Sequence, residues 1–115
     1  MGGNDGGLLV VPDGAFNNAN KAMTAALAVK YRVPAIYYDR SYAAAGGLMS
    51  YGPNQLLQYR YGAIYVDRIL RGAKPGDLPV QFETKFELVI NLQTARLLGI
   101  EVPPTLLAIA DEVIE

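Results

Sequence analysis

The sequence predicts an α/β fold in which three parallel strands form the core of a sheet and helices cover both of its faces. Three short apolar runs end in polar or turn-forming residues: Leu8–Val11, Val33–Tyr38 and Leu48–Met49, the last of which opens a predicted strand over Leu48–Tyr51. Helix-like segments follow these runs, and a short, continuous apolar run is typical of a strand that is buried on both faces. Open parallel sheets bind ligands outside the carboxyl ends of their strands, so we expect a ligand where these runs end.

The first half of the chain alternates strand and helix. Asp13 follows the first strand and is placed to cap a helix over residues 15–31, which are Ala-rich and carry large apolar side chains on one face. Pro34 opens the second strand, where a missing N–H costs least. The segment Ser41–Ala45 predicts one helical turn before two glycines.

The third strand leads into a long helix. Pro53 suits the first turn of this helix, which we expect to reach Arg71 and to stop at Gly72. A turn-rich linker and a short extended piece, Pro79–Phe82, are expected to follow.

The C-terminal part predicts one more strand and two helices. Lys85–Ile90 is rich in residues that favour strands, and Asn91 is expected to cap a helix over Leu92–Leu98 that Gly99 closes. Prolines 103 and 104 are expected to start a last helix. Its apolar residues recur at i, i+4, i+7 and i+8: Leu106, Ala110, Val113 and Ile114.

Composition narrows the classes of function. The 115 residues allow one domain or a piece of one, and 51% apolar with 18% charged residues indicates a globular chain. The net charge of −1 and the lack of a basic stripe argue against nucleic acid as a partner. The sequence has no Cys and no His, which removes thiol nucleophiles and the commonest metal ligands. We therefore expect no enzyme, no metal and no cofactor.

The N-terminus carries no targeting signal in this sequence. It has no basic region, and its first apolar run is four residues long, so it does not resemble a signal peptide. No stretch approaches the roughly 20 apolar residues that span a bilayer. The chain as written is therefore expected in the cytoplasm.

Candidate site residues lie at the carboxyl ends of the second and third strands. Alternation puts Tyr37 and Tyr38 on opposite faces, so at most one of them reaches a cleft and the other is expected in the core. Asp39 and Arg40 form either a solvated pair or the rim of a cleft. The stretch Ser50-Tyr51-Gly52 is either a strand-to-helix turn or a ligand contact, because Gly52 lets backbone approach closely and Tyr51 offers a ring and a hydroxyl.

Several segments resemble one family, the ABC-type transporter substrate-binding proteins related to tryptophan- and tyrosine-binding lipoproteins. They occur in order and at family-like spacing from Gly7 onward. These segments are Gly7–Asp13, Val33–Tyr37, Ala45–Pro53, Tyr65–Pro75, Asp77–Val80, Thr84–Asn91 and Val102–Glu115.

The resemblance implies a fold and an activity. The chain looks like the last third of such a protein: a truncated Rossmann-like sheet from the C-terminal lobe of a type I periplasmic-binding-protein fold. Residues 1–7 would then be a flexible N-terminus, 8–72 a partial α/β binding lobe, and 73–115 a crossover strand with C-terminal helices. The implied ligand is a small-molecule solute such as an amino acid, especially an aromatic one. The implied partner is an ABC permease, and family members work in the periplasm or anchored by lipid outside the inner membrane.

The resemblance also suggests roles for individual residues. Asp13 would face the amino group of a bound amino acid, beside its simpler role as a helix cap. Tyr38, Asp39, Ser50, Tyr51 and Gly52 complete the expected ligand-binding set. A small hydrolase that uses Asp13 and Asp39 is a weaker alternative.

Self-association is a further expectation. The family's topology would leave the Leu8–Val11 strand unpaired on one side, and the Lys85–Ile90 strand without its usual partners. We therefore expect a symmetric homodimer with an apolar interface above roughly 2,000 Å² in total. The alternative to solute binding is a truncated lobe that assembles with itself and binds nothing specific.

Overall fold

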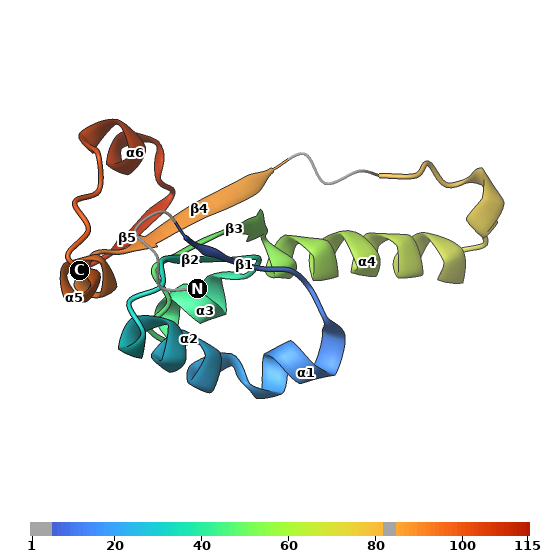
Figure 1. Ribbon diagram of the computed structural model, residues 1–115. Coiled ribbons are helices and arrows are strands. Elements are labelled where there is room, and N and C mark those ends of the chain that lie inside the picture. The colour runs from blue at the N-terminus through green and yellow to red at the C-terminus, as the bar shows by residue number, and fades with distance from the viewer. Residues whose placement is uncertain (1–5, 82–84) are drawn as a thin grey trace. The chain divides into compact units, whose positions relative to one another are not determined.

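The computed structural model describes residues 6–81 and 85–115 (Figure 1). The chain divides into two compact units. Unit 1 holds the chain up to Gly52 together with Glu87–Glu115, and unit 2 holds Pro53–Phe86. No helix in the described ranges is long and apolar enough to cross a bilayer.

Unit 1 is built on a sheet whose five strands lie in the order in which they occur along the chain. The strands are β1 (Leu8–Val10), β2 (Ala35–Tyr37), β3 (Met49–Pro53), β4 (Phe86–Asn91) and β5 (Glu112–Ile114). Three of the strand pairs are parallel: β1 with β2, β2 with β3, and β4 with β5. Figure 1 shows β4 running opposite to β3. The predicted α/β class with a three-stranded parallel core is confirmed, and β4 and β5 extend the sheet beyond that core.

The helices begin and end at residues whose side chains or dihedral angles explain the boundaries. They are α1 (Gly14–Ala19), α2 (Lys21–Lys30), α3 (Arg40–Ala44), α4 (Gln55–Leu70), η1 (Pro75–Asp77), α5 (Leu92–Leu98) and α6 (Pro104–Ile109). Asn54 caps α4 and Asn91 caps α5, each accepting a hydrogen bond from a backbone N–H in the first turn. Gly99 closes α5 in the left-handed conformation with φ 69°, as the sequence predicts.

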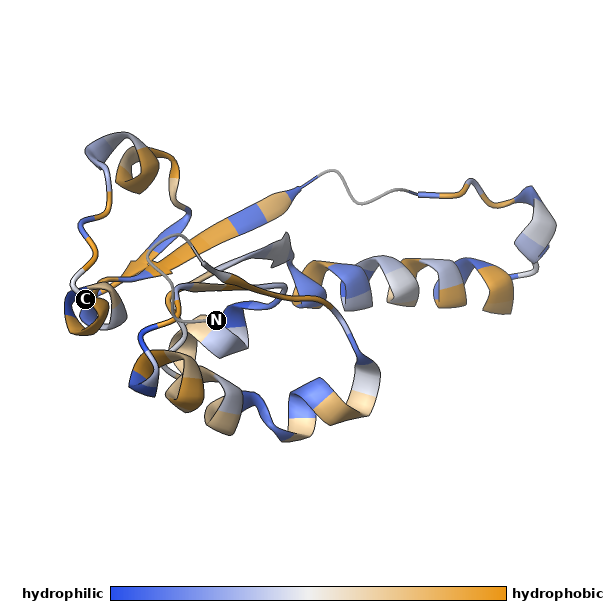
Figure 2. Cartoon of the chain, in the orientation of Figure 1, coloured by the Kyte–Doolittle hydropathy of each residue, from blue (hydrophilic) through white to orange (hydrophobic). Residues whose placement is uncertain are grey.

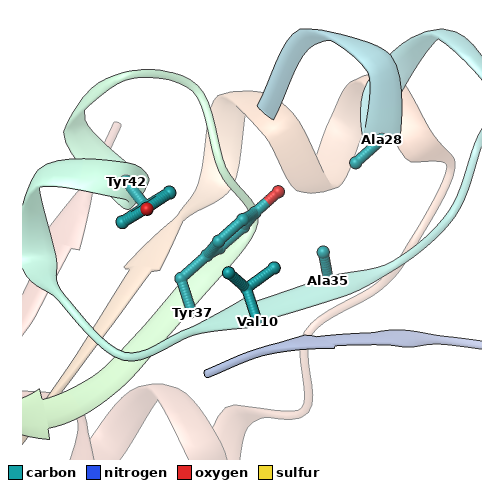
Figure 3. Close-up of a cluster of buried hydrophobic side chains, with 5 residues drawn as sticks. All are labelled: Val10, Ala28, Ala35, Tyr37 and Tyr42. Atoms are coloured by element: carbon teal, nitrogen blue, oxygen red, sulfur yellow. The ribbon is translucent and has the colours of Figure 1, made fainter. Parts of the chain in front are cut away.

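One hydrophobic core lies between the first two strands and α2 and α3. Register pairs Leu8 with Ala35 and Val10 with Tyr37, which puts these side chains on one face of the sheet. There they meet Ala28 of α2 and Tyr42 of α3 (Figure 3). The small residues of α2 let the helix approach closely enough for the Tyr37 ring to fill the space beneath it.

A second core gathers the C-terminal elements of unit 1. Leu88 and Ile90 of β4 pack with Leu48, with Ala95 of α5 and with Val102. Leu106 and Leu107 of α6 cover this cluster. Asn91 points the other way, and its side-chain amide donates to the Ala43 carbonyl at 2.9 Å. The two faces of β4 therefore join different helices to the sheet.

The single helix expected over residues 15–31 is wrong, because α1 ends at Ala19 and α2 begins at Lys21. Asn20 separates them. Its side-chain amide donates to the Phe16 carbonyl at 2.8 Å, and its backbone N–H donates to the same carbonyl at 3.1 Å. Asparagine competes in this way with the helical backbone, which explains a break that apolar periodicity does not reveal.

The last helix predicted up to Ile114 is also wrong, because α6 ends at Ile109 and β5 follows. The Asp111 backbone N–H donates to the Leu88 carbonyl at 2.9 Å, and the Asp111 carboxylate accepts from the Leu88 N–H at 2.8 Å. These bonds tie the segment to β4, so Val113 and Ile114 add a strand to the sheet instead of continuing a helical face.

Three smaller expectations need correction. Pro53 ends β3 and lies before α4, which starts at Gln55. Pro79–Gln81 has no regular structure, and Phe82 lies outside the described residues. The edge position expected for the first strand is confirmed, but β4 lies between β3 and β5, so the expectation that it lacks partners is wrong.

Candidate functional site

The carboxyl ends of β2 and β3 are held together by a close approach of backbone. A Cβ atom placed on Gly52 would lie 1.9 Å from the Tyr38 carbonyl oxygen. No residue with a side chain fits there without a shift of one of the two strands' ends. The sequence predicts that Gly52 lets the backbone approach a ligand closely. In the structure, Gly52 instead lets the backbone of β3 pack against the Tyr38 carbonyl.

The two tyrosines at the end of β2 separate as alternation predicts. Tyr37 is 1% exposed and belongs to the core, while Tyr38 is half-buried. The Tyr38 ring lies 5.4 Å from the Tyr42 ring, at an interplanar angle of 58°. Tyr51, on β3, is 55% exposed. The carboxyl edge of unit 1 thus presents one half-buried and one exposed tyrosine on neighbouring strands.

Asp39 is fixed as the N-cap of α3. Its Oδ1 accepts from the Ser41 backbone N–H at 2.9 Å and also from the Ser41 hydroxyl. These bonds hold the carboxylate beside the end of β2. Asp39 is therefore held by hydrogen bonds and lacks the freedom of a mobile catalytic base. This weakens the hypothesis that the chain is a small hydrolase.

Arg40 is paired with a residue far along the chain, not with Asp39. Its Nε and Nη2 atoms donate to the two carboxylate oxygens of Glu112, at 2.6 and 2.5 Å. This bidentate pair joins the first residue of α3 to β5. Sequence reasoning misses Glu112 because the segment is predicted to be helical. The pair lowers the pKa of the Glu112 carboxyl, chiefly through the hydrogen bonds from Arg40.

The Arg40–Glu112 pair predicts a small dependence of stability on pH. The folded-state pKa of Glu112 lies below its ordinary value of 4.5, so the contribution is present above that pH and is lost as the pH falls through the folded-state pKa. Both side chains are more than a third exposed, so solvent screens the pair. We expect Glu112→Gln to lower the free energy of unfolding by at most ~1 kcal/mol at neutral pH.

Urea denaturation at neutral and acid pH checks this expectation, with Glu101→Gln as a control for the loss of one exposed carboxylate. The difference between wild type and Glu112→Gln should shrink in acid. A difference that stays constant over the whole pH range would contradict the pairing.

Asp13 and Ser50 lie in contrasting environments. Asp13 occupies the N-cap position of α1 and is exposed, but its side chain makes no capping hydrogen bond. Asp13 therefore holds the predicted N-cap position without the side-chain hydrogen bond that a cap would make. Ser50 is 1% exposed on the strand position that pairs with Tyr37, so its hydroxyl is buried in this structure. The ligand-binding roles of both residues stay predictions.

Unit 1 has two hollows whose linings differ from the carboxyl ends of β2 and β3. The first, about 320 Å³, lies at the amino ends of the strands, where its apolar lining includes Leu9, Pro34, Ile36 and Met49. The second, about 570 Å³, lies between α2 and α5. In the second hollow the Thr94 hydroxyl already donates to the Gly46 carbonyl. The first hollow lacks the polar groups that a charged solute needs. The carboxyl ends of β2 and β3 therefore remain the better candidate for the solute-binding site.

Comparison with known proteins identifies the family. A sequence model of the family described as ABC transporter substrate binding protein matches residues 1–114. No curated protein sequence matches the chain.

Solved structures show the same relation. A conserved domain protein from Vibrio cholerae O1 biovar El Tor is 32% identical, with a TM-score of 0.82, over 92% of this chain. An ABC domain in complex with L-Trp from Streptococcus pneumonia is 26% identical, with a TM-score of 0.84, over 93% of this chain. A ligand-free, open substrate binding protein with adhesive properties from Clostridium difficile shares the fold at 24% identity, with a TM-score of 0.62, over 93% of this chain.

This chain covers 36% of the length of each of these three structures. It therefore corresponds to about a third of such a protein, and the predicted fold, that of part of a periplasmic-binding-protein lobe, is confirmed. The match over nearly all of its residues shows that the chain belongs to the family of ABC transporter substrate-binding proteins.

Proposed function

We propose that this chain is a solute-binding component of an ABC-type transport system and that it binds an amino acid with an aromatic side chain. The observation that carries the proposal is the carboxyl edge of β2 and β3, where Tyr38, Asp39 and Tyr51 lie beside the fixed contact between Gly52 and Tyr38. The Streptococcus relative, described as a complex with L-Trp, supports this class of ligand.

Each of these residues suits one part of such a ligand. A tyrosine ring offers a face on which an aromatic side chain stacks, at ring separations of about 4.5–7 Å. The Asp39 carboxylate turns Oδ1 to Ser41, and we propose Oδ2 as the acceptor for the ligand's ammonium group. Asp13, exposed after β1, is the second carboxylate proposed for this group. We propose that the solute is bound and passed to an ABC permease without chemical conversion.

The first experiment measures ligand binding by calorimetry and by thermal unfolding of the full chain. L-Trp, L-Tyr and L-Phe are compared with L-Ala at equal concentration. A ligand at 100 times its dissociation constant should raise the free energy of unfolding by about 2.7 kcal/mol. Absence of any stabilisation by the aromatic amino acids would contradict solute binding by this chain and favour the alternative of a lobe that only self-assembles.

Two substitutions test the site itself. Tyr51→Ala should weaken L-Trp binding roughly tenfold through the lost ring contact. Asp39→Asn keeps a good capping residue and removes the charge, so it should weaken binding at little cost in stability. Tyr31→Ala is the matched control, because Tyr31 is 63% exposed and precedes β2 at the opposite end of the sheet. If Tyr51→Ala and Asp39→Asn bind L-Trp with the same affinity as Tyr31→Ala and the wild-type chain, the ligand binds elsewhere.

The cytoplasmic location expected from the sequence stays a prediction. Cell fractionation of the unmodified chain tests it, and recovery in the periplasmic fraction would contradict it.

A further inference from the structure

Helix α4 is rich in apolar residues, yet none of its residues is buried. Four of its large apolar side chains are more than half exposed: Leu56 at 63%, Tyr59 at 78%, Val66 at 56% and Leu70 at 81%. Figure 2 shows hydrophobic residues recurring along the helix. An apolar stripe of this length on a water-facing helix indicates an interaction surface.

These exposed residues form a regular stripe. Together with Ala63, they follow one another in alternating steps of three and four residues, which is the spacing that two paired helices bury between them. We call Leu56, Tyr59, Ala63, Val66 and Leu70 the α4 stripe. Tyr65 lies off the stripe, and its hydroxyl donates to the Pro79 carbonyl in the same unit. The segment after α4 therefore contacts another side of the helix.

Charged residues border the stripe in a self-complementary pattern. Arg60 and Asp67 lie on the same side of the stripe, seven residues apart. When two such helices pair antiparallel around a two-fold axis with Ala63 against the partner's Val66, Arg60 falls beside the partner's Asp67. The same contact occurs twice by symmetry, and Tyr59 meets the partner's Leu70 at each end.

We propose that the α4 stripe is a homodimer interface, in which α4 pairs antiparallel with α4 of a second copy of this chain. A parallel pair would set Ala63 against the partner's Ala63, and it would place Arg60 and Asp67 beside uncharged residues. The charge pattern therefore favours a second copy in the antiparallel arrangement. The Asp67 Oδ1 atom also accepts a hydrogen bond from Arg71 Nε at 3.0 Å. Both side chains are largely exposed, so this bond competes only weakly with a pair between Asp67 and the partner's Arg60.

The area of the α4 stripe sets the affinity that we expect for the dimer. One pair of helices of this length buries less than the ~1,200 Å² typical of stable complexes. We therefore expect a reversible dimer with a dissociation constant in the micromolar range. This surface is distinct from the β1 edge, and the proposal holds whether or not the chain binds a solute.

Sedimentation equilibrium of the full chain tests the stripe. In Val66→Lys each copy places one positive charge at the centre of the interface. This should raise the dissociation constant of the dimer ~100-fold or more. Gln58→Lys introduces the same residue on an exposed position away from the stripe and should leave the dimer intact. Far-ultraviolet circular dichroism confirms that both variants stay folded.

Charge exchange tests the register. Arg60→Asp and Asp67→Arg should each weaken the dimer, and the double variant should restore it. Arg68→Asp, off the stripe, is the control. Because the sequence has no cysteine, a mixture of Ala63→Cys and Val66→Cys chains should form a disulfide between the two variants, and Ala63→Cys alone should not cross-link efficiently.

Two results would overturn the proposal. A wild-type chain that stays monomeric up to ~100 µM would rule out pairing of the α4 stripe with a second copy. A dimer that survives Val66→Lys but dissociates in Leu9→Lys would place the interface at the β1 edge. Leu9 suits that test because it is 67% exposed, whereas Val10 is part of the core.

Discussion

Replacing Gly52 with alanine should lower the free energy of unfolding by about 3 kcal/mol or more, because the new methyl group would overlap the Tyr38 carbonyl oxygen. The atom in the way belongs to the backbone, so no side-chain rotation relieves the overlap. The end of β2 or of β3 must move, and Asp39 and Tyr51 would move with it. Affinity for an amino acid at this edge should therefore fall together with stability.

Gly76→Ala is the matched control, because a Cβ atom at Gly76 meets nothing within 4 Å. Its free energy of unfolding should stay within about 0.5 kcal/mol of the wild-type value. Urea denaturation followed by circular dichroism compares the two variants. Equal stability of the two alanine variants would show that the ends of β2 and β3 do not pack as described.

Truncation of Tyr42 is the second change with a large expected effect. Tyr42 is fully buried, and its ring stacks on Tyr37 with centroids 4.9 Å apart (Figure 3). Lys21 places its Nζ atom 5.3 Å from the centre of the Tyr42 ring. Tyr42→Ala would leave a cavity under α2 and α3 and should lower the free energy of unfolding by about 3–5 kcal/mol.

Tyr42→Phe separates the ring from its hydroxyl. Within the described ranges, the buried hydroxyls of Tyr42 and Tyr37 have no hydrogen-bond partner. Removing one of them should leave stability unchanged or raise it by about 1 kcal/mol. A loss of more than 1 kcal/mol in Tyr42→Phe would mean that the hydroxyl has a partner, such as the neighbouring Tyr38 hydroxyl.

Alkaline pH gives an independent check of the same cluster. Burial raises the pKa of the Tyr42 hydroxyl above its ordinary value of 10.0, and burial also raises the pKa of Tyr37. A raised folded-state pKa means that the stability is present below pH 10 and is lost as the pH rises further. Tyr42→Phe should therefore lose less stability than wild type between neutral pH and pH 11.

The sequence predicts well those elements that local chemistry decides. Asn91 and Gly99 begin and end α5 as expected, because the cap and the left-handed stop depend on neighbouring residues alone. The separation of Tyr37 from Tyr38 follows from strand alternation. The order and parallel pairing of the first three strands follow from the positions of their apolar runs.

Contacts between distant segments decide what the sequence does not predict. Val113 and Ile114 fit a helical face equally well, and it is the pairing with β4, together with the bonds between Asp111 and Leu88, that makes their segment a strand. Arg40 and Glu112 are 72 residues apart, so no local pattern joins them. The role of Gly52 depends on the carbonyl of a neighbouring strand, which spacing along one chain does not reveal.

Unit 1 is discontinuous in the chain, and this affects how its sheet forms. β3 and β4 are neighbours in the sheet, but residues 54–85 separate them in sequence. Their pairing must await the synthesis of the later segment and must close a long loop, so we expect it to be a slow event in folding. The closure entropy grows only with the logarithm of loop length, and doubling the loop costs about 0.6 kcal/mol. Unit 1 can therefore carry insertions of very different length at this point with little loss of stability.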